Sequence, residues 1–108
     1  MNEKIIQLIN SLILKTDQSQ IGWQRTSRSN EFKVNLSNGA VSTDRWVDNG
    51  IEYLDFRVFN NVGEEIGSWQ FKFNDADFAL LLSLHSTVLR KYLKIDETID
   101  GMLGELLF

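Results

Sequence analysis

The first apolar residues of the chain recur three and four positions apart, which is the spacing of one face of an α-helix. Polar and charged side chains occupy the opposite side of the same helical wheel. The pattern predicts an amphipathic helix over residues 2–16. Its apolar face comprises Ile5, Ile6, Leu8, Ile9, Leu12 and Ile13.

A second helical periodicity runs from Phe78 to Ile95, and its apolar stripe is wide. The preceding "NDAD" supplies N-cap candidates. So wide a stripe predicts contact with a sheet and with a neighbouring helix. The following "DETIDGMLGELL" predicts a short third helix, whose apolar side carries Ile99, Met102, Leu103 and Leu106.

Between the helical segments, apolar and polar residues alternate, and two Asn-Gly dipeptides mark hairpins. A two-residue turn at residues 38–39 places Val34 opposite Thr43. A second turn at residues 49–50 places Thr43 opposite Phe56. One face then stays mostly apolar through both turns, which supports both registers.

A third hairpin follows in "VFNNVGEEIGSWQF". A four-residue loop at residues 61–64 pairs Phe56 with Trp69, whereas a three-residue loop would leave the aromatic residues of the last strand on the wrong face. We therefore predict the four-residue loop.

The stretch "IGWQRTSRSNEFKV" holds a tryptophan and two arginines, so it is either a hairpin or a basic grip for nucleic acid. A four-residue turn at residues 26–29 pairs Trp23 with Phe32 and puts Trp23 in the apolar row. Arg25 and Arg28 then sit near one loop tip. Because base contacts need many converging donors, we favour the hairpin.

These elements predict an α+β fold in a single domain, residues 1–108. A five-stranded antiparallel meander forms one of two layers. The N-terminal helix and one or two C-terminal helices cover one face of the sheet, and the other face is open to solvent.

The predicted registers place several chemically notable residues on the open face. Gln24, Glu31, Trp46, Tyr53 and Lys72 form one row. Gly22, Lys33, Asp44, Asp55 and Gln70 form the next, and Ala40, Phe59 and Ile66 are neighbours near the far edge. We expect a candidate interaction face made of Trp46, Tyr53, Lys72, Arg57, Phe59 and Ile66.

The amino-acid composition and the absence of known motifs exclude several kinds of functional site. There are no cysteines, which excludes disulfides and thiolate metal sites and fits the cytoplasm. No apolar run is long enough to span a membrane. The sequence also lacks phosphate-loop, HExxH and calcium-loop motifs, so we expect no cofactor and no metal.

The net charge of −4 is concentrated at the C-terminus. All eleven bases and eleven of the fifteen acids precede residue 95, so these charges balance. The excess acids are Asp96, Glu97, Asp100 and Glu105. An acidic chain repels nucleic acid at long range, which counts against a nucleic-acid partner.

Two features raise the possibility of catalysis. His85, the single histidine, falls within the apolar stripe and is interpreted as a core residue with one satisfied nitrogen rather than a base. Asp44 opposite Asp55 could form an acid/base pair or a metal site, but on an open sheet we favour a solvated pair neutralised by Lys33 and Arg57.

The order of "LINSLILKT", "IGWQRT", "YLDFRVFNNVGEEI" and "NDADFALLLSLHSTVLRKYLK" resembles a class of small uncharacterised bacterial α-β(meander)-α proteins. Proteins of this class are often associated with phages or mobile elements. The resemblance implies a small accessory or binding protein and carries no catalytic residues.

The sequence therefore favours a non-enzymatic module that binds a protein partner, or a second copy of itself, through the open face or the acidic tail. An alternative is a nucleic-acid or small-ligand binder that uses Trp46 and Tyr53. A third hypothesis, ranked below both, is an enzyme that uses Asp44 and Asp55.

Overall fold

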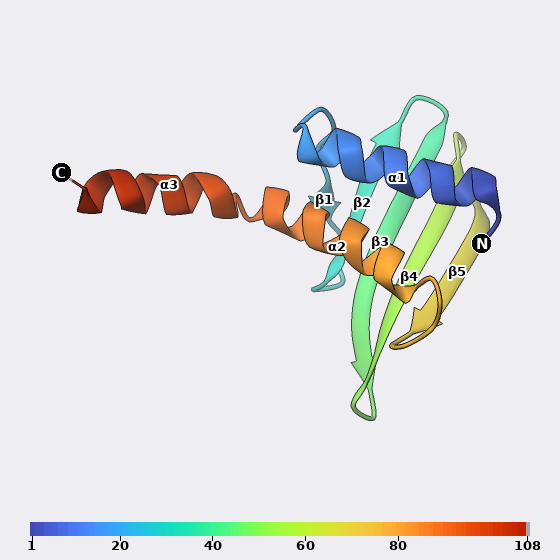
Figure 1. The fold of residues 1–108 in the computed structure, drawn as a ribbon. Coiled ribbons are helices and arrows are strands. Elements are labelled where there is room, and N and C mark those ends of the chain that lie inside the picture. Colours follow the sequence, from blue (N-terminus) through green and yellow to red (C-terminus); the bar gives the residue numbers. More distant parts are fainter. Residues whose placement is uncertain (108) are drawn as a thin grey trace.

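The structure, a computed structural model, describes residues 1–107. The five strands form one antiparallel sheet in which chain order is also spatial order (Figure 1). The α+β meander predicted from the sequence is confirmed. The elements are α1 (Glu3–Asp17), β1 (Gln24–Arg25), β2 (Glu31–Leu36), β3 (Gly39–Asp48), β4 (Ile51–Asn60), β5 (Glu65–Lys72), α2 (Phe78–Tyr92) and α3 (Ile95–Leu106).

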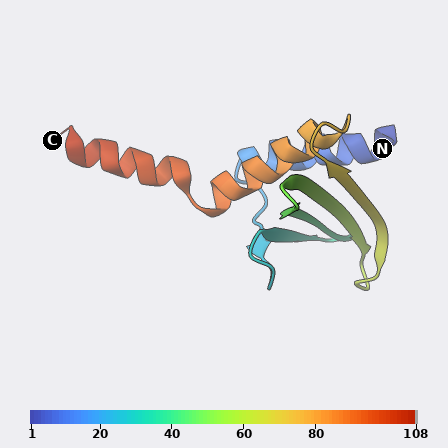
Figure 2. The same cartoon turned by 90° about the horizontal axis from the view of Figure 1, so that it is seen from below.

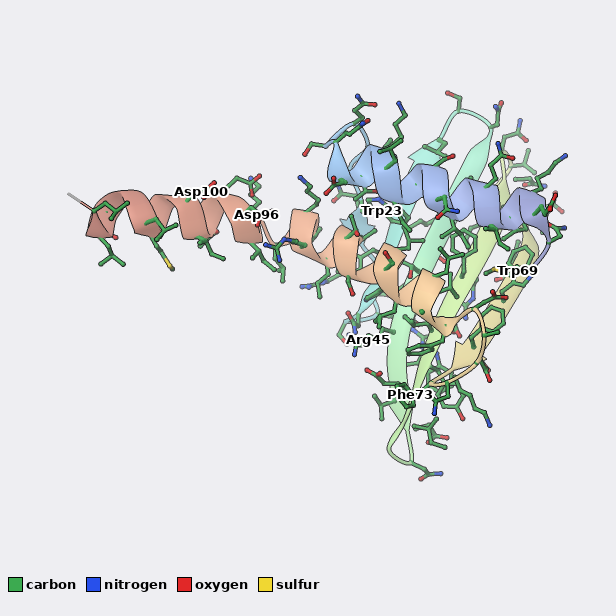
Figure 3. All side chains as sticks on the ribbon, viewed as in Figure 1. Trp23, Arg45, Trp69, Phe73, Asp96 and Asp100 are labelled. Carbon is green, nitrogen blue, oxygen red and sulfur yellow. The ribbon has the colours of Figure 1, made fainter. Side chains whose placement is uncertain are left out.

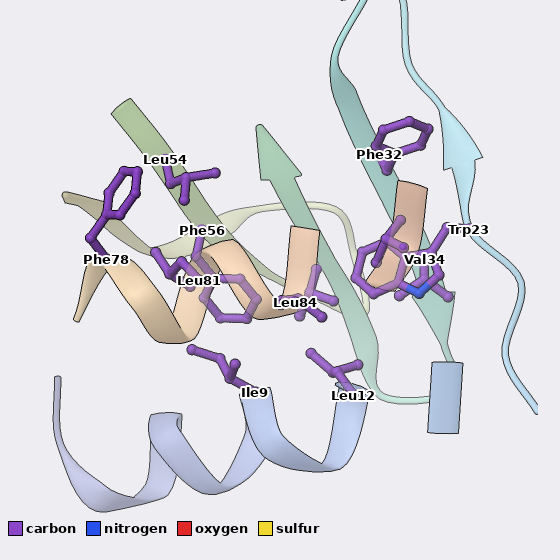
Figure 4. Packing of buried hydrophobic residues seen from close by; sticks show 12 residues of the cluster. Ile9, Leu12, Trp23, Phe32, Val34, Leu54, Phe56, Phe78, Leu81 and Leu84 are labelled. Carbon is purple, nitrogen blue, oxygen red and sulfur yellow. The ribbon is translucent and has the colours of Figure 1, made fainter. Parts of the chain in front are cut away.

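Helices α1 and α2 lie together on one face of the sheet, and within residues 1–107 no helix lies on the other face (Figure 2). The core between the two layers is almost entirely apolar, and its burial is the main stabilising term of the fold. Figure 4 shows how the side chains of both helices meet those of the strands. The buried cluster comprises Ile9, Leu12, Trp23, Phe32, Val34, Val41, Leu54, Phe56, Phe78, Leu81, Leu84 and Val88.

The β3–β4 turn and the body of the β4–β5 pairing match the prediction. Asn49 and Gly50 have φ values of 50° and 77°, as a two-residue type I′ turn requires. Thr43 lies opposite Phe56, and Phe56 lies opposite Trp69.

The predicted β2–β3 register is wrong by two residues. The turn residues are Ser37 and Asn38, so Val34 faces Val41 rather than Thr43. Gly39 is part of β3, where a Cβ would lie 2.3 Å from the Phe59 carbonyl oxygen of β4. The glycine at this position is needed for close approach of two backbones, not for a turn.

The predicted β1–β2 register is also wrong by two residues. Arg25, not Trp23, lies opposite Phe32, and the Thr26 amide donates to the Glu31 carbonyl at 3.0 Å, which leaves residues 27–30 as the loop. Trp23 is buried in the apolar cluster nonetheless, and its Nε1 donates to Thr16 Oγ1 of α1 at 2.9 Å.

A bulge changes the loop end of the β4–β5 hairpin. The Asn60 amide donates to the Glu64 carbonyl at 2.9 Å, so the loop is residues 61–63 rather than 61–64. Phe59 then pairs with Glu65, and Ile66 is the extra residue. The prediction that Ile66 lies opposite Phe59 is therefore wrong.

Helix α2 ends at Tyr92, three residues earlier than the periodicity indicated, and its N-cap Asp77 pairs with the Met1 amino group instead of capping the helix. Lys94, at φ 53°, turns the chain into α3. Helix α3 extends away from both layers and has no buried residue (Figures 1 and 2). Of the two C-terminal helices, only α2 covers the sheet.

The close approach at Gly39 predicts a large effect of one methyl group. Gly39→Ala should lower the free energy of unfolding by about 1–3 kcal/mol, because the Phe59 backbone must move. Gly22→Ala is the matched control, since a Cβ there meets nothing within 4 Å. Urea denaturation of both variants measures the difference, and equal midpoints would contradict the close approach of Gly39 in β3 to the Phe59 backbone in β4.

Candidate functional site

Two of the predicted interaction residues form an aromatic stack on the open face. Trp46 and Tyr53 lie opposite each other on β3 and β4, with ring centroids 4.3 Å apart and planes 12° apart. Lys72 of β5 lies next to Tyr53, as predicted. The stack is half-buried. The Trp46 Nε1 donates to Asp55 Oδ2 at 3.0 Å, so this indole already has its hydrogen-bond partner.

A row of three carboxylates crosses the open face beside the stack. Glu31, Asp44 and Asp55 are direct neighbours on β2, β3 and β4, and only 9%, 3% and 5% exposed. The row exists because the observed β2–β3 register, which differs by two residues from the predicted one, sets Glu31 opposite Asp44. Glu31 was predicted beside Trp46, and Lys33 beside Asp44, whereas Lys33 lies opposite Ser42.

Two arginines pair with this row of three carboxylates, which we call the acid row. Arg57 lies 3.5 Å from carboxylate oxygens of Glu31 and Asp55, and Arg28 lies 3.0 Å from Asp44 Oδ2. The Thr26 hydroxyl adds a hydrogen bond to Glu31 at 2.7 Å. The predicted Asp44–Asp55 adjacency is confirmed, but the prediction that the pair is solvated is wrong, because surrounding side chains bury it.

Burial raises the pKa of Asp44 above its ordinary value, because desolvation penalises the charged form more than Arg28 favours it. The carboxylates of Glu31 and Asp55 raise this pKa further, and Arg57 lowers it. Within residues 1–107, no three histidine or carboxylate groups are placed to hold a metal ion.

The remaining predicted interaction residues lie apart from the stack. Phe59 of β4 packs under the Lys33 ammonium group, whose nitrogen is 4.3 Å from the ring centroid. Ile66 is 65% exposed on the bulge. Both line a shallow hollow at the loop end of the sheet, together with Leu8 and Leu36. Arg57, the last member of the predicted set, belongs to the acid row.

His85 is a core residue, as predicted, but both of its ring nitrogens have partners. Asn30 donates through Nδ2 to the Arg45 carbonyl at 3.1 Å, so its Oδ1 faces His85 Nε2, also at 3.1 Å. Nε2 must therefore carry the proton, and Nδ1 accepts from the Thr43 hydroxyl at 3.1 Å. Burial, followed by the charge of Arg45, lowers the pKa of His85 to about 4.

Helix α3 presents the apolar side that its periodicity predicted. Apart from the half-buried Ile95, its large apolar residues are between 46% and 80% exposed, and its acidic residues are exposed as well. Figure 3 shows Asp96 and Asp100 far from the sheet. The exposed apolar set is Ile99, Met102, Leu103 and Leu106.

Sequence reasoning missed the structural partners of these groups. Thr26 and Arg28 come from the β1–β2 loop, and Asn30 reaches His85 from the end of the same loop. No spacing signal marks such contacts, because each depends on how the β1–β2 hairpin sits on β3. A correct β2–β3 register would have found the Glu31–Asp44 adjacency.

No helix within the described residues is both long and apolar enough to cross a membrane. No protein-family model matches the chain, and neither the curated proteins nor the solved structures contain a match to it. The function must therefore be argued from the surfaces themselves.

The buried neutral imidazole predicts a pH-dependent contribution to stability. The unfolded chain takes up a proton at His85 below pH 6.5, whereas the folded chain resists uptake until about pH 4. The His85 contribution is therefore full above this window and is lost as the pH falls through it, by about 3 kcal/mol. The wild type should be more stable than His85→Gln above this window, and this difference in the free energy of unfolding should disappear as the pH falls from 6.5 to about 4. An advantage that stays constant in denaturant melts would contradict the neutral buried state.

The raised pKa of Asp44 predicts a pH dependence of stability opposite in sign to that of His85. The folded chain holds the Asp44 proton to a higher pH than the unfolded chain, so ionisation costs stability as the pH rises above 3.8, the ordinary pKa of aspartate. Asp44→Asn should therefore gain stability relative to the wild type over this range. Asp48→Asn makes the same chemical change at an exposed position and is the matched control. If Asp44→Asn instead becomes less stable relative to the wild type as the pH rises, the charge of Arg28 affects the pKa of Asp44 more than burial does.

Proposed function

We propose that the protein is a non-enzymatic interaction module that binds a protein partner through the apolar side of α3. The observation that supports this most directly is that α3 has no buried residue, although four large apolar side chains follow one another along it. Such a stripe normally packs against a core or a groove. Helix-in-groove recognition uses the same i, i+3, i+4, i+7 anchors, here Ile99, Met102, Leu103 and Leu106.

The helix is short and weak on its own, which favours stabilisation by a partner. Its 12 residues include Gly101 and Gly104, each costing about 1 kcal/mol relative to alanine. Isolated helices of this length are marginal in water. At 100° per residue, both glycines lie opposite the apolar stripe, so they loosen the helix without interrupting its contact surface.

Charge indicates the chemistry of the partner. The segment from Ile95 to Leu106 carries four acids and no base. Arg90 of α2 pairs with Asp96, and by helical spacing Glu105 flanks the stripe on the other side. We therefore infer an apolar groove rimmed by Lys and Arg, since complementary charges steer association. The same acids disfavour an anionic lipid surface, which attracts basic helices.

The open face is the second candidate binding surface. Its Trp46–Tyr53 pair leaves aromatic surface for a ligand, but the Trp46 N–H already has a partner and three carboxylates lie alongside. Those carboxylates repel phosphates, which counts against nucleic acid. Asp44 and Asp55 face Arg28 and Arg57, an arrangement that supports a structural ion network over catalysis.

We place this binding in the cytoplasm, in keeping with the absence of cysteine, and we take the resemblance to small phage-associated proteins as support for an accessory role.

A pair of surface variants tests the proposal. Ile99→Ser with Leu106→Ser removes two of the four apolar anchors of α3, and Trp46→Ser with Tyr53→Ser removes the stacked aromatic pair of the open face. Affinity capture from the encoding organism, followed by direct titration of the retained protein, should show at least about tenfold weaker binding for the α3 variant alone. Gly101→Ala with Gly104→Ala should tighten the same complex by stabilising the helix.

The α3 variants should melt like the wild type, because none of the substituted residues is buried. Loss of binding only in the Trp46/Tyr53 variant would show that the partner binds the open face of the sheet instead of α3. Retention of nucleic acid instead of protein, or equal binding by all variants, would contradict the proposal.

A further inference from the structure

The outer side of β5 is a sheet edge with no strand beyond it (Figure 1). It runs from Glu65 to Lys72, and the segment between these two charges is "IGSWQF". Natural edges are usually protected by proline, by charge or by covering elements, because their free backbone groups pair readily with another chain. No such charge or proline interrupts the middle of this edge.

The hydrogen bonds at the end of β5 show which amides point outward. The Phe73 amide donates to the Glu52 carbonyl of β4 at 2.9 Å, so residue 73 faces inward. Backbone groups alternate along an antiparallel strand, so 71 and 69 also face β4. Ser68, Gln70 and Lys72 therefore direct their N–H and C=O groups to the outer edge. The Lys72 amide confirms this direction, because it donates to Asp75 Oδ2 at 2.8 Å, outside the sheet.

Both ends of this edge are closed. At one end, the Asp75 amide donates back to the Lys72 carbonyl at 2.9 Å, which completes a tight turn. At the other end, the bulge beside Phe59 breaks the regular alternation of β5, so the regular series of outward-facing groups begins at Ser68. The free groups are thus concentrated at Ser68 and Gln70, two residues apart. This spacing is self-complementary, because a two-fold axis through Trp69 sets each of them opposite the other.

We propose that two copies of this chain associate through antiparallel pairing of β5 with β5, centred on Trp69. Ser68 of each copy pairs with Gln70 of the other, which gives four backbone hydrogen bonds. The β-strands of both copies then form one continuous sheet with a closed, isologous interface.

Side chains support the same register. Glu65 contacts Arg57 and therefore lies on the open face, where Lys72 also lies beside Tyr53. Antiparallel pairing brings Glu65 of one copy near Lys72 of the other, so unlike charges meet at both ends. On the helix-facing side, the half-buried Trp69 comes beside Trp69 of the second copy. Figure 3 places Trp69 at this margin of the molecule. Aromatic cross-strand pairs at such positions stabilise sheets.

The outer edge of β5 is separate from α3, so dimerisation through β5 does not depend on partner binding by α3. A pairing through β5 leaves both copies of α3 free, and the assembly would present two docking helices to its partners. Its test measures the mass of the pure protein and needs no partner.

Gln70→Pro tests the pairing most sharply. Proline removes an N–H that points away from β4, which edge strands tolerate, so the fold is retained while two of the four hydrogen bonds are lost. Gln70→Thr keeps the N–H and is the matched control. Sedimentation equilibrium should show dimers of the wild type and of Gln70→Thr at concentrations on the order of 100 µM, with dimerisation of Gln70→Pro weakened at least about tenfold.

Amide exchange of the wild type tests the same interface without a substitution. The Ser68 and Gln70 amides should exchange more slowly at high than at low protein concentration, while neighbouring loop amides should not change. Lys72→Glu, on the surface, should weaken association because it sets like charges near each other. A wild type that stays monomeric at this concentration, or a Gln70→Pro variant that dimerises as well as Gln70→Thr, would overturn the inference.

Discussion

The fold depends on burying the helix-facing side of the sheet. Strands β2 to β4 contribute Phe32, Val34, Val41, Leu54 and Phe56 to that side, and α1 with α2 is enough to cover them. Once these two helices are in place, α3 has nothing left to cover. The chain therefore folds around one core and leaves one helix, one sheet face and the two sheet edges at β1 and β5 outside it.

Buried polar groups fix the details that apolar packing leaves open. The Thr43–His85–Asn30 chain ties α2 to β3 and to the end of the β1–β2 loop. On the other face, that loop supplies Arg28 to the acid row. The hairpin is thus held from both sides of the sheet. The charges of the open face are largely matched among themselves, whereas the excess negative charge lies on α3, along which four exposed apolar side chains also follow one another.

The sequence predicted the fold class and nearly every core residue, because hydrophobic periodicity carries that information. It also predicted the turn at Asn49 and Gly50, where local φ requirements decide. Gly39 misled the same reasoning, because this glycine serves a contact with Phe59 that exists only in the folded sheet. Next to β1, Trp23 likewise has a tertiary partner, Thr16 of α1, that no sequence spacing indicates.

A two-residue slip keeps every side chain on its face, so these errors left the core unchanged but altered the neighbours on the open side. Glu31 moved from Trp46 to Asp44, and the acid row could not be predicted for that reason. The pairing of Phe59 with Glu65 was missed because a bulge has no reliable signal in sequence. The acidic tail was identified from charge alone, whereas its projection away from the body required the structure.

Residue-resolved hydrogen exchange of the dilute, unbound protein tests the central claim that α3 is an unpacked helix awaiting a partner. The account predicts that amides within Ile95–Leu106 exchange orders of magnitude faster than those of Leu81–Val88 in α2, since local opening is cheap where no side chain is buried. Protection of α3 equal to that of α2 at a concentration where the protein is monomeric would contradict it, because the helix would then already be packed on its own domain.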